Sequence, residues 1–265
     1  MNIVRHMLLA LQFFTRIPVT GRLAEWVGFS PEALRASSAH FPAVGWVVGA
    51  ITAAVYALIA WHLPEQPGAP WVAAFVSTVV GVLLTGAFHE DGLADLADGL
   101  GGSMDRERAL EIMKDSRVGS FGAAALVLAL VGKLALLALT GQISTSLACA
   151  ALFAAHVSSR FAPLFVIRTL PHVGDAAGSK SKPLADAISM SALMGAGAWW
   201  LAAMALTFWL YPLMALLGGL LGCVLAFWWM RRMLARRLQG FTGDGLGATQ
   251  QVCELAFYLG LLLAL

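Results

Sequence analysis

The sequence predicts an all-α fold, a polytopic membrane helix bundle of about seven transmembrane helices with an amphipathic helix at the N-terminus. Hydrophobic residues make up 59% of the chain and charged residues only 12%, about half of the roughly 25% that a soluble domain carries. The mean hydropathy is +0.78. The apolar residues form long segments, and the basic residues are concentrated in alternate connections between them. We therefore expect residues 1–265 to form one integral membrane domain.

A spanning helix needs roughly 20 mainly apolar residues, and seven segments meet or approach this length. They are residues 41–61, 71–88, 118–139, 146–167, 189–210, 213–230 and 250–265. The last segment is short but has room to begin near Leu246, and a turn is expected at Tyr211 and Pro212 because proline ends a helix. Residues 3–15 are expected to form an interfacial or buried amphipathic helix. Their apolar run is short and lacks the cleavage site of a secretory signal.

The charged residues indicate the orientation. Of the 17 Lys and Arg residues, only Lys133 and Arg160 lie inside predicted spans. The others, including Lys180 and Lys182, lie before the first span or in the connections that follow the second, fourth and sixth spans. The positive-inside rule therefore predicts that these segments and the N-terminus are cytoplasmic. All acidic residues except Glu65 and Glu254 lie on the same side, so we expect the chemistry there.

Two classes of partner are not indicated. A net charge of +2 is too small to suggest nucleic acid. The three cysteines all lie in apolar stretches without metal-binding spacing, so we interpret them as buried apolar residues.

The strongest candidate site is the segment 89–99, HEDGLADLADG, which follows the second span without a proline. We expect the helix to run on, with Asp91, Asp95 and Asp98 on one face and Glu90 about 100° away. Carboxylates on one face repel each other, and a divalent cation offsets that cost. Mg²⁺ prefers oxygen ligands and usually retains water and substrate phosphates, so the cluster suggests phosphate or diphosphate chemistry. The alternative is a solvated acidic face, although glycines in such a helix indicate close backbone approach.

Two further segments contain candidate phosphate-binding residues. In residues 113–122, Lys114 and Arg117 are suited to bind phosphate oxygens, and Gly119 with its neighbour offers backbone donors near a helix N-terminus; the alternative is ordinary positive-inside anchoring. Residues 239–249 contain four glycines around Asp244, just before the last span. They lack the GK[ST] of a P-loop but suit a phosphate cradle, with Asp244 as a metal ligand or base. The alternative is a flexible connection.

The two basic residues inside predicted spans are also candidates. An ionisable residue within the membrane is a functional candidate by default. Arg160 lies toward the cytoplasmic end of its span, where snorkelling to the interface is the alternative. Lys133 lies deeper, where it would pair with an acid or line a cavity; its role stays open.

Together these motifs resemble the cobalamin synthase (adenosylcobinamide-GDP ribazoletransferase) family of membrane enzymes. The resemblance covers nearly the whole chain, and the motifs come in the family's order. The matching segments are FFTRIPV at 13–19, HFPAVG at 40–45, EDGLADLADG at 90–99, KDSRVGSFG at 114–122, SRFAP at 159–163 and GDGLGA at 243–248.

The resemblance implies a phosphoryl transfer at the membrane surface. The substrates would be adenosylcobinamide-GDP and α-ribazole or its 5′-phosphate, and the products would be adenosylcobalamin, or its 5′-phosphate, and GMP, with Mg²⁺ assisting. It implies a bacterial cytoplasmic (inner) membrane, contact with lipid and no nucleic-acid partner, and it leaves a homo-oligomer open. The residues that we assign are the metal ligands Glu90, Asp91, Asp95 and Asp98, the catalytic residues Asp244, Lys114 and Arg117, and the substrate-binding residues Arg160, Ser116, Gly119, Thr242 and Gly243.

Three other classes of membrane protein fit the sequence less well. CDP-alcohol phosphotransferases expect an Arg where this chain has Asp95, and aromatic prenyltransferases expect a second aspartate-rich motif where it offers only Asp244. A transporter would have ionisable residues at the bilayer midplane and paired discontinuous helices. Only Lys133 is deep, and no two halves of the chain match.

Overall fold

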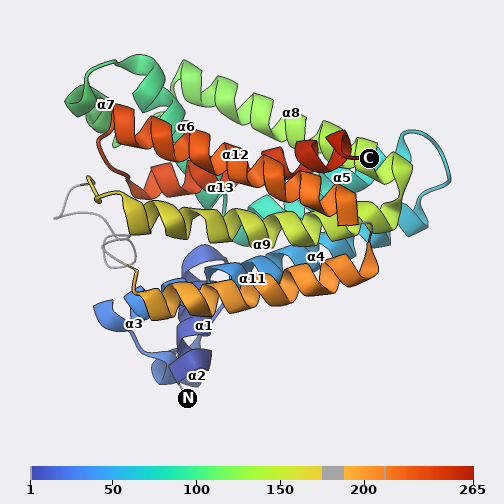
Figure 1. Cartoon of the computed structure of the whole chain (residues 1–265), viewed down its shortest axis with the longest axis horizontal. Helices are drawn as coiled ribbons and strands as arrows, with labels where there is room; N and C mark the ends of the chain where they lie inside the picture. The colour runs from blue at the N-terminus through green and yellow to red at the C-terminus, as the bar shows by residue number, and fades with distance from the viewer. Residues whose placement is uncertain (1, 175–187, 212) are drawn as a thin grey trace.

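A computed structural model describes residues 2–174, 188–211 and 213–265. The described residues fold into helices joined by short connections (Figure 1). The helices are α1 (Asn2–Phe14), α2 (Gly21–Val27), α3 (Pro31–Ser37), η1 (Ser38–His40), α4 (Phe41–His62), α5 (Ala69–Thr85), α6 (Phe88–Gly102), α7 (Arg106–Ile112), α8 (Ser120–Ile143), α9 (Thr145–Thr169), α11 (Met190–Leu210), α12 (Leu213–Arg237) and α13 (Gly243–Leu263).

The predicted membrane bundle is confirmed. Six helical stretches in the described part of the chain are long and apolar enough to cross a membrane, and α5 with α6 forms a bent pair that brings the number to seven. The six stretches are Pro31–His62, Ser120–Ile143, Thr145–Thr169, Met190–Leu210, Met214–Arg237 and Gly243–Leu263. The last begins earlier than the predicted segment 250–265. Lys180, Lys182 and the expected turn residue Pro212 lie outside the described residues.

One expectation is wrong, because the second span does not run on into the acidic segment. Helix α5 ends at Thr85, and α6 leaves it at an angle of 87°. Gly86 and Ala87 both have left-handed backbone conformations, with φ values of 64° and 59°. The N–H of Ala87 donates to the Val82 carbonyl at 2.9 Å, which is the hydrogen bond of a Schellman motif. The Arg16 side chain packs directly on Gly86, where a Cβ atom would collide with it.

Helix α9 lies at the centre of the bundle, with 83% of its apolar window buried. Figure 1 shows α12 and α13 on one side of it and α4 with α11 on the other. Small residues bring the helix backbones close together, as is usual in membrane bundles. A Cβ atom on Gly45 of α4 would lie 2.5 Å from the carbonyl oxygen of His156 on α9.

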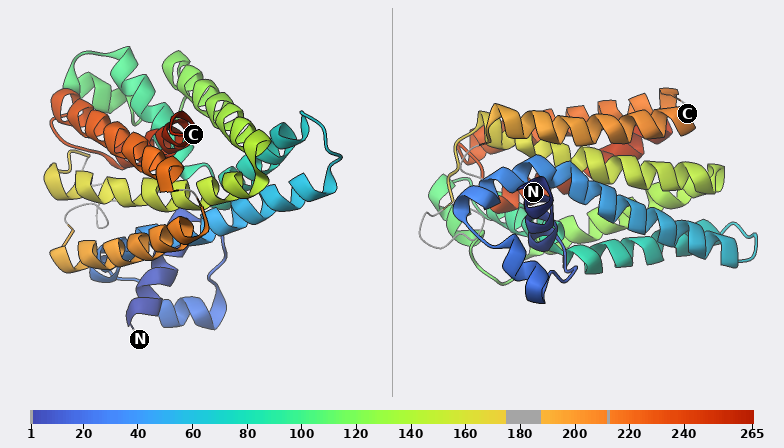
Figure 2. Two further views of the ribbon diagram at one scale, coloured as in Figure 1. Left: turned by 45° about the vertical axis from the view of Figure 1, so that its right-hand side comes forward. Right: turned by 90° about the horizontal axis from the view of Figure 1, so that it is seen from below.

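The predicted amphipathic helix is confirmed as α1. It lies across the long axis of the bundle (Figures 1 and 2) and buries Leu9 and Ala10. The acidic helix α6, helix α7 and the start of α13 lie at one end of the bundle. The α4–α5 connection and the C-terminus lie toward the other end (Figure 1). The segments with the candidate site residues therefore share one end.

Candidate functional site

Carboxylates from two helices form the centre of the candidate site. Helix α6 is continuous from Phe88 to Gly102, so the predicted i, i+4 spacing of Asp91 and Asp95 is retained despite the bend before it. Asp95 is half-buried, and this burial disfavours its ionised form, as do the charges of Asp91, Asp244 and Asp98. Asp244, in the first turn of α13, interacts with Asp91 in the same way. Four carboxylates thus share one electrostatic environment, which favours a cation.

Glycines hold the two helices close together at this point. Gly92 of α6 lies against the backbone of Asp244, because a Cβ atom there would be 2.9 Å from the Asp244 carbonyl oxygen. On the other helix, a Cβ atom on Gly247 would lie 3.4 Å from the Cα atom of His89. Gly99 similarly accommodates α7, with the Ala109 carbonyl oxygen 2.9 Å from its virtual Cβ. The expected close backbone approach is confirmed, and it explains why glycines occur inside α6.

Glu90 faces the next turn of α13. Its Oε1 accepts a hydrogen bond of 3.1 Å from Gln251 Nε2. Its Oε2 is buried and has no partner among the described residues. A buried carboxylate oxygen without a partner is costly, and a cation or a hydrogen-bond donor would relieve that cost.

Asp98 is buried and connects α6 to the start of α8. Its two oxygens accept hydrogen bonds of 2.7 Å from the backbone N–H groups of Gly119 and Gly122. Asp98 therefore caps α8, a function that sequence reasoning missed because the cap comes from another helix. The Gly119 N–H that we expected to face a phosphate donates to Asp98 here. The roles of Asp98 in metal binding and of Gly119 in substrate binding stay predictions.

The basic residues of the second motif lie on the exposed connection between α7 and α8. Lys114, Ser116 and Arg117 are all exposed. Arg117 pairs with Asp115, with 2.9 Å between Nε and Oδ1, and its hydrogen bonds lower the pKa of the Asp115 carboxyl to about 2. Arg117 also lines an open groove of about 470 Å³ together with Asp98 and Gly119. Of these three residues, Arg117 thus lies in the same groove as Asp98 of the acidic helix.

Residues 243–249 of the glycine-rich segment belong to α13 itself, and residues 239–242 lie in the connection ahead of it. Thr242 is the N-cap, and its Oγ1 accepts a hydrogen bond of 3.1 Å from the Gly245 N–H. Gly243 and Asp244 are the first two residues of the helix. Thr242 therefore has a structural role beside its predicted contact with substrate, and Asp244 is fixed to a regular helix.

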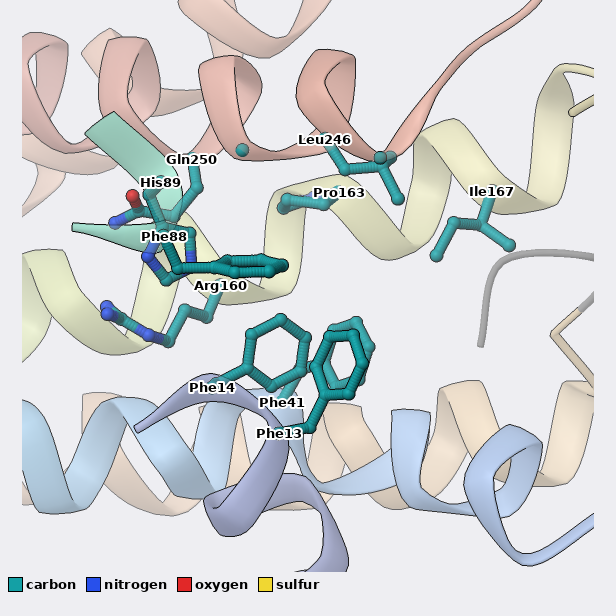
Figure 3. A pocket seen from close by; sticks show the side chains of 12 residues that line it. Phe13, Phe14, Phe41, Phe88, His89, Arg160, Pro163, Ile167, Leu246 and Gln250 are labelled. Atoms are coloured by element: carbon teal, nitrogen blue, oxygen red, sulfur yellow. The ribbon is translucent and has the colours of Figure 1, made fainter. Parts of the chain in front are cut away.

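The two intramembrane cations differ in their partners. Lys133 forms a buried ion pair with Glu254 of α13, with 2.6 Å between Nζ and Oε1. Gln250 and Tyr258 also donate to the Glu254 carboxylate, at 2.7 and 3.0 Å. This answers the open question about Lys133, which pairs across the bundle. Arg160 is equally buried, forms no salt bridge among the described residues, and lines a pocket (Figure 3). Gly243 lines the same pocket.

The residues present could hold a metal ion only if water and substrate phosphates supply some of its ligands. Within residues 2–174, 188–211 and 213–265, no three His, Cys, Asp or Glu side chains are close enough together to hold a metal ion. Mg²⁺ usually takes one or two carboxylates and completes its octahedron with water and substrate phosphates. The unpartnered Oε2 of Glu90 and the three carboxylates that interact with Asp95 suit that mode of binding.

Comparison with known proteins gives the family. A family model described as cobalamin-5-phosphate synthase matches residues 6–262. A protein named adenosylcobinamide-GDP ribazoletransferase from Albidiferax ferrireducens is 61% identical over 276 residues, covering 99% of each chain. Proteins of the same name from Polaromonas sp. and Vibrio cholerae are 58% and 44% identical, covering 99% and 96% of this chain and 98% and 92% of their own. No solved structure matches. The chain belongs to the cobalamin-5-phosphate synthase family.

Proposed function

We propose that this chain joins adenosylcobinamide-GDP to α-ribazole, or to its 5′-phosphate, and releases GMP. The names of its relatives support the substrates. The observation in the molecule that supports the chemistry is the convergence of α6 and α13, where Gly92 lets Asp244 approach Asp91 and Asp95. In the reaction, a ribose oxygen forms a bond to the phosphorus beside the cobinamide arm. The bond from that phosphorus to GMP breaks, and the bridging oxygen leaves with GMP.

The metal would be held by the acidic helix. Glu90, Asp91, Asp95 and Asp98 are the proposed Mg²⁺ ligands, and Asp244 is a further candidate. When bound, Mg²⁺ would neutralise the diphosphate and the charge that develops on GMP. The buried, unpartnered Oε2 of Glu90 supports this assignment.

The chain's own residues would position the reacting groups. Asp244, fixed in the first turn of α13, would accept the proton of the attacking hydroxyl or bind the metal. Lys114 and Arg117 would bind the phosphoryl oxygens, with Arg160 as a third candidate. Donors of Ser116, Gly119, Thr242 and Gly243 would complete the substrate contacts.

The site would face the cytoplasm from a bacterial inner membrane. The basic residues that follow the second and sixth spans, such as Arg106 and Arg237, lie beside the acidic helix. Arg106 donates to the Leu238 carbonyl at 2.7 Å, and Arg237 donates to the Ser103 carbonyl at 2.7 Å. The positive-inside rule favours the cytoplasm for this end, where nucleotide substrates are made.

Asparagine substitutions of the acidic helix test the metal assignment. Asp91→Asn and Asp95→Asn keep the side-chain size and remove the charge, so each should slow GMP release and shift the Mg²⁺ titration to higher concentration. Glu65→Gln, in the exposed connection after α4, is the matched control and should behave as wild type. Near wild-type rates for both aspartate variants across the Mg²⁺ titration would exclude the proposed metal site.

A further inference from the structure

An aromatic pocket lies beside the acidic site, between α1 and α4 on one side and α9 and α13 on the other (Figure 3). The rings of Phe13, Phe14 and Phe41 form one wall, and Pro163 and Leu246 lie opposite them. The lining is almost wholly apolar. Apolar walls of this kind suit an aromatic ligand, because rings pack face to face or edge to face on other rings and on aliphatic side chains.

One end of the pocket is polar. His89, Arg160 and Gln250 gather there in Figure 3. Arg160 is 5% exposed, and its Nη1 donates to the carbonyl oxygen of His156 at 3.1 Å. Its Nε is buried and has no partner among the described residues. A buried N–H without an acceptor is costly, and a ligand atom with a lone pair would satisfy it.

The pocket is also next to the residues proposed to carry out the transfer. Gly243 and Leu246, which line it, flank Asp244 on the first turns of α13. In a nucleoside the base and the reacting hydroxyl belong to the same ribose, so the base must bind within one sugar ring of the attacked phosphorus. A pocket that shares the first turn of α13 with Asp244 meets that requirement.

We propose that this pocket binds the aromatic base of the acceptor nucleoside, with the unsubstituted ring nitrogen of the base accepting a hydrogen bond from Arg160. The inference rests on the proposed function and assigns Arg160 to the base and not to the phosphoryl group. The base of α-ribazole is a flat, largely apolar bicyclic ring with one free nitrogen, which matches the apolar walls and the buried, unpartnered Nε–H of Arg160. Guanine has donors and acceptors along its edge, and the corrin ring is far larger than the pocket.

The pocket must widen to accept the base. Its free volume is about 50 Å³ in this conformation, whereas an apolar cavity of about 150 Å³ is known to accept a single benzene ring. Phe13 and Phe14 belong to the last turn of α1, which is not one of the spanning helices. Their outward movement is the change that the proposal requires.

The pocket also predicts a preference among bases. A base with an exocyclic amino group would bury that group against phenylalanine side chains without an acceptor. Such an unpaired group lowers affinity by about 10- to 100-fold. A benzimidazole riboside should therefore bind more tightly than an adenine riboside.

The test measures binding of α-ribazole without the corrinoid donor, through the intrinsic fluorescence of the benzimidazole. Loss of ring stacking in Phe14→Ala should weaken binding by at least about 5-fold. Phe75→Ala is the matched control, because Phe75 lies on α5 with 55% of its surface exposed, and it should bind as wild type. In wild type, an indole riboside, which lacks the free ring nitrogen, should bind more weakly than α-ribazole. Arg160→Gln should abolish most of that difference.

The outcomes separate this inference from the proposed function. If wild type forms cobalamin and GMP while Phe14→Ala and Arg160→Gln bind α-ribazole within twofold of wild type, the pocket assignment is wrong and the function stands. If these variants lose affinity for adenosylcobinamide-GDP and not for α-ribazole, the pocket belongs to the donor, which also overturns the inference. If wild type neither binds α-ribazole nor transfers it, the proposed function fails.

Discussion

Replacement of Gly92 by alanine should inactivate the enzyme far more than it unfolds it. The added Cβ atom would lie 2.9 Å from the Asp244 carbonyl oxygen, whereas ordinary contacts begin at 3.4 Å. The two helices must therefore separate by ~0.5 Å at the point where their carboxylates meet. Overpacking of this kind costs about 1–3 kcal/mol of folding free energy. The higher helix propensity of alanine offsets about 1 kcal/mol of it.

The effect on activity should be larger, because a misplacement of about 1 Å at a catalytic site costs on the order of 100-fold in rate, and this shift is about half as large. We expect Gly92→Ala to lower kcat/KM by tens of fold, measured as GMP release, while the melting temperature in detergent falls by only a few degrees. Gly132→Ala is the matched control, since nothing lies within 4 Å of a Cβ atom at that position of α8. A Gly92→Ala enzyme with more than half of the wild-type kcat/KM would refute the reasoning. Loss of activity only in proportion to unfolded protein would refute it as well.

Three further predictions concern buried and exposed charges. Lys133→Met leaves Glu254 buried without its cation and should cost about 3–5 kcal/mol of folding free energy. Adding Glu254→Gln to this variant should restore most of the lost stability, measured by thermal unfolding. Asp98→Asn loses one acceptor of the α8 cap and should lower stability by about 1 kcal/mol in the absence of Mg²⁺. Arg117 is 87% exposed in its pair with Asp115, so Arg117→Gln should leave stability nearly unchanged and raise the KM for the diphosphate substrate.

Each of these predictions has a contrary result. Additive losses in the Lys133 and Glu254 double variant would mean that the pair does not act as a unit. An Asp98→Asn protein that is as stable as wild type would argue against the capping role. An unchanged KM in Arg117→Gln would remove this residue from the phosphate-binding set.

The spans were predictable from sequence, because each is a long, mainly apolar segment and lipid selects for such segments directly. The break between α5 and α6 was not, although Gly86 was a visible signal. Glycine is common at the ends of helices but also occurs inside them. Here Arg16, from a distant segment, packs on Gly86, and its backbone N–H donates to the Leu84 carbonyl. The predicted spacing of the acidic residues on one helix face still holds, because all of them lie after the break.

Contacts between helices that are distant in the sequence could not be predicted, for a related reason. In the sequence Asp98 is one of several acidic residues in a cluster, but in the structure it accepts hydrogen bonds from backbone N–H groups at the start of α8. Lys133 and Glu254 are isolated charges in different spans, and their opposite signs were the one hint that they pair. The aromatic pocket draws residues from α1, α4, α6, α9 and α13, so no local pattern could indicate it.

The central claim is that a ribazole hydroxyl attacks the phosphorus beside the cobinamide arm and displaces GMP. The most direct measurement uses purified chain, Mg²⁺, α-ribazole and adenosylcobinamide-GDP labelled with ³²P at that phosphorus. The account predicts that the label is retained in adenosylcobalamin and that unlabelled GMP forms in equal amount, only when both substrates are present. Label in a cobinamide phosphate, or transfer from a CDP-alcohol or prenyl diphosphate donor in place of this one, would contradict it.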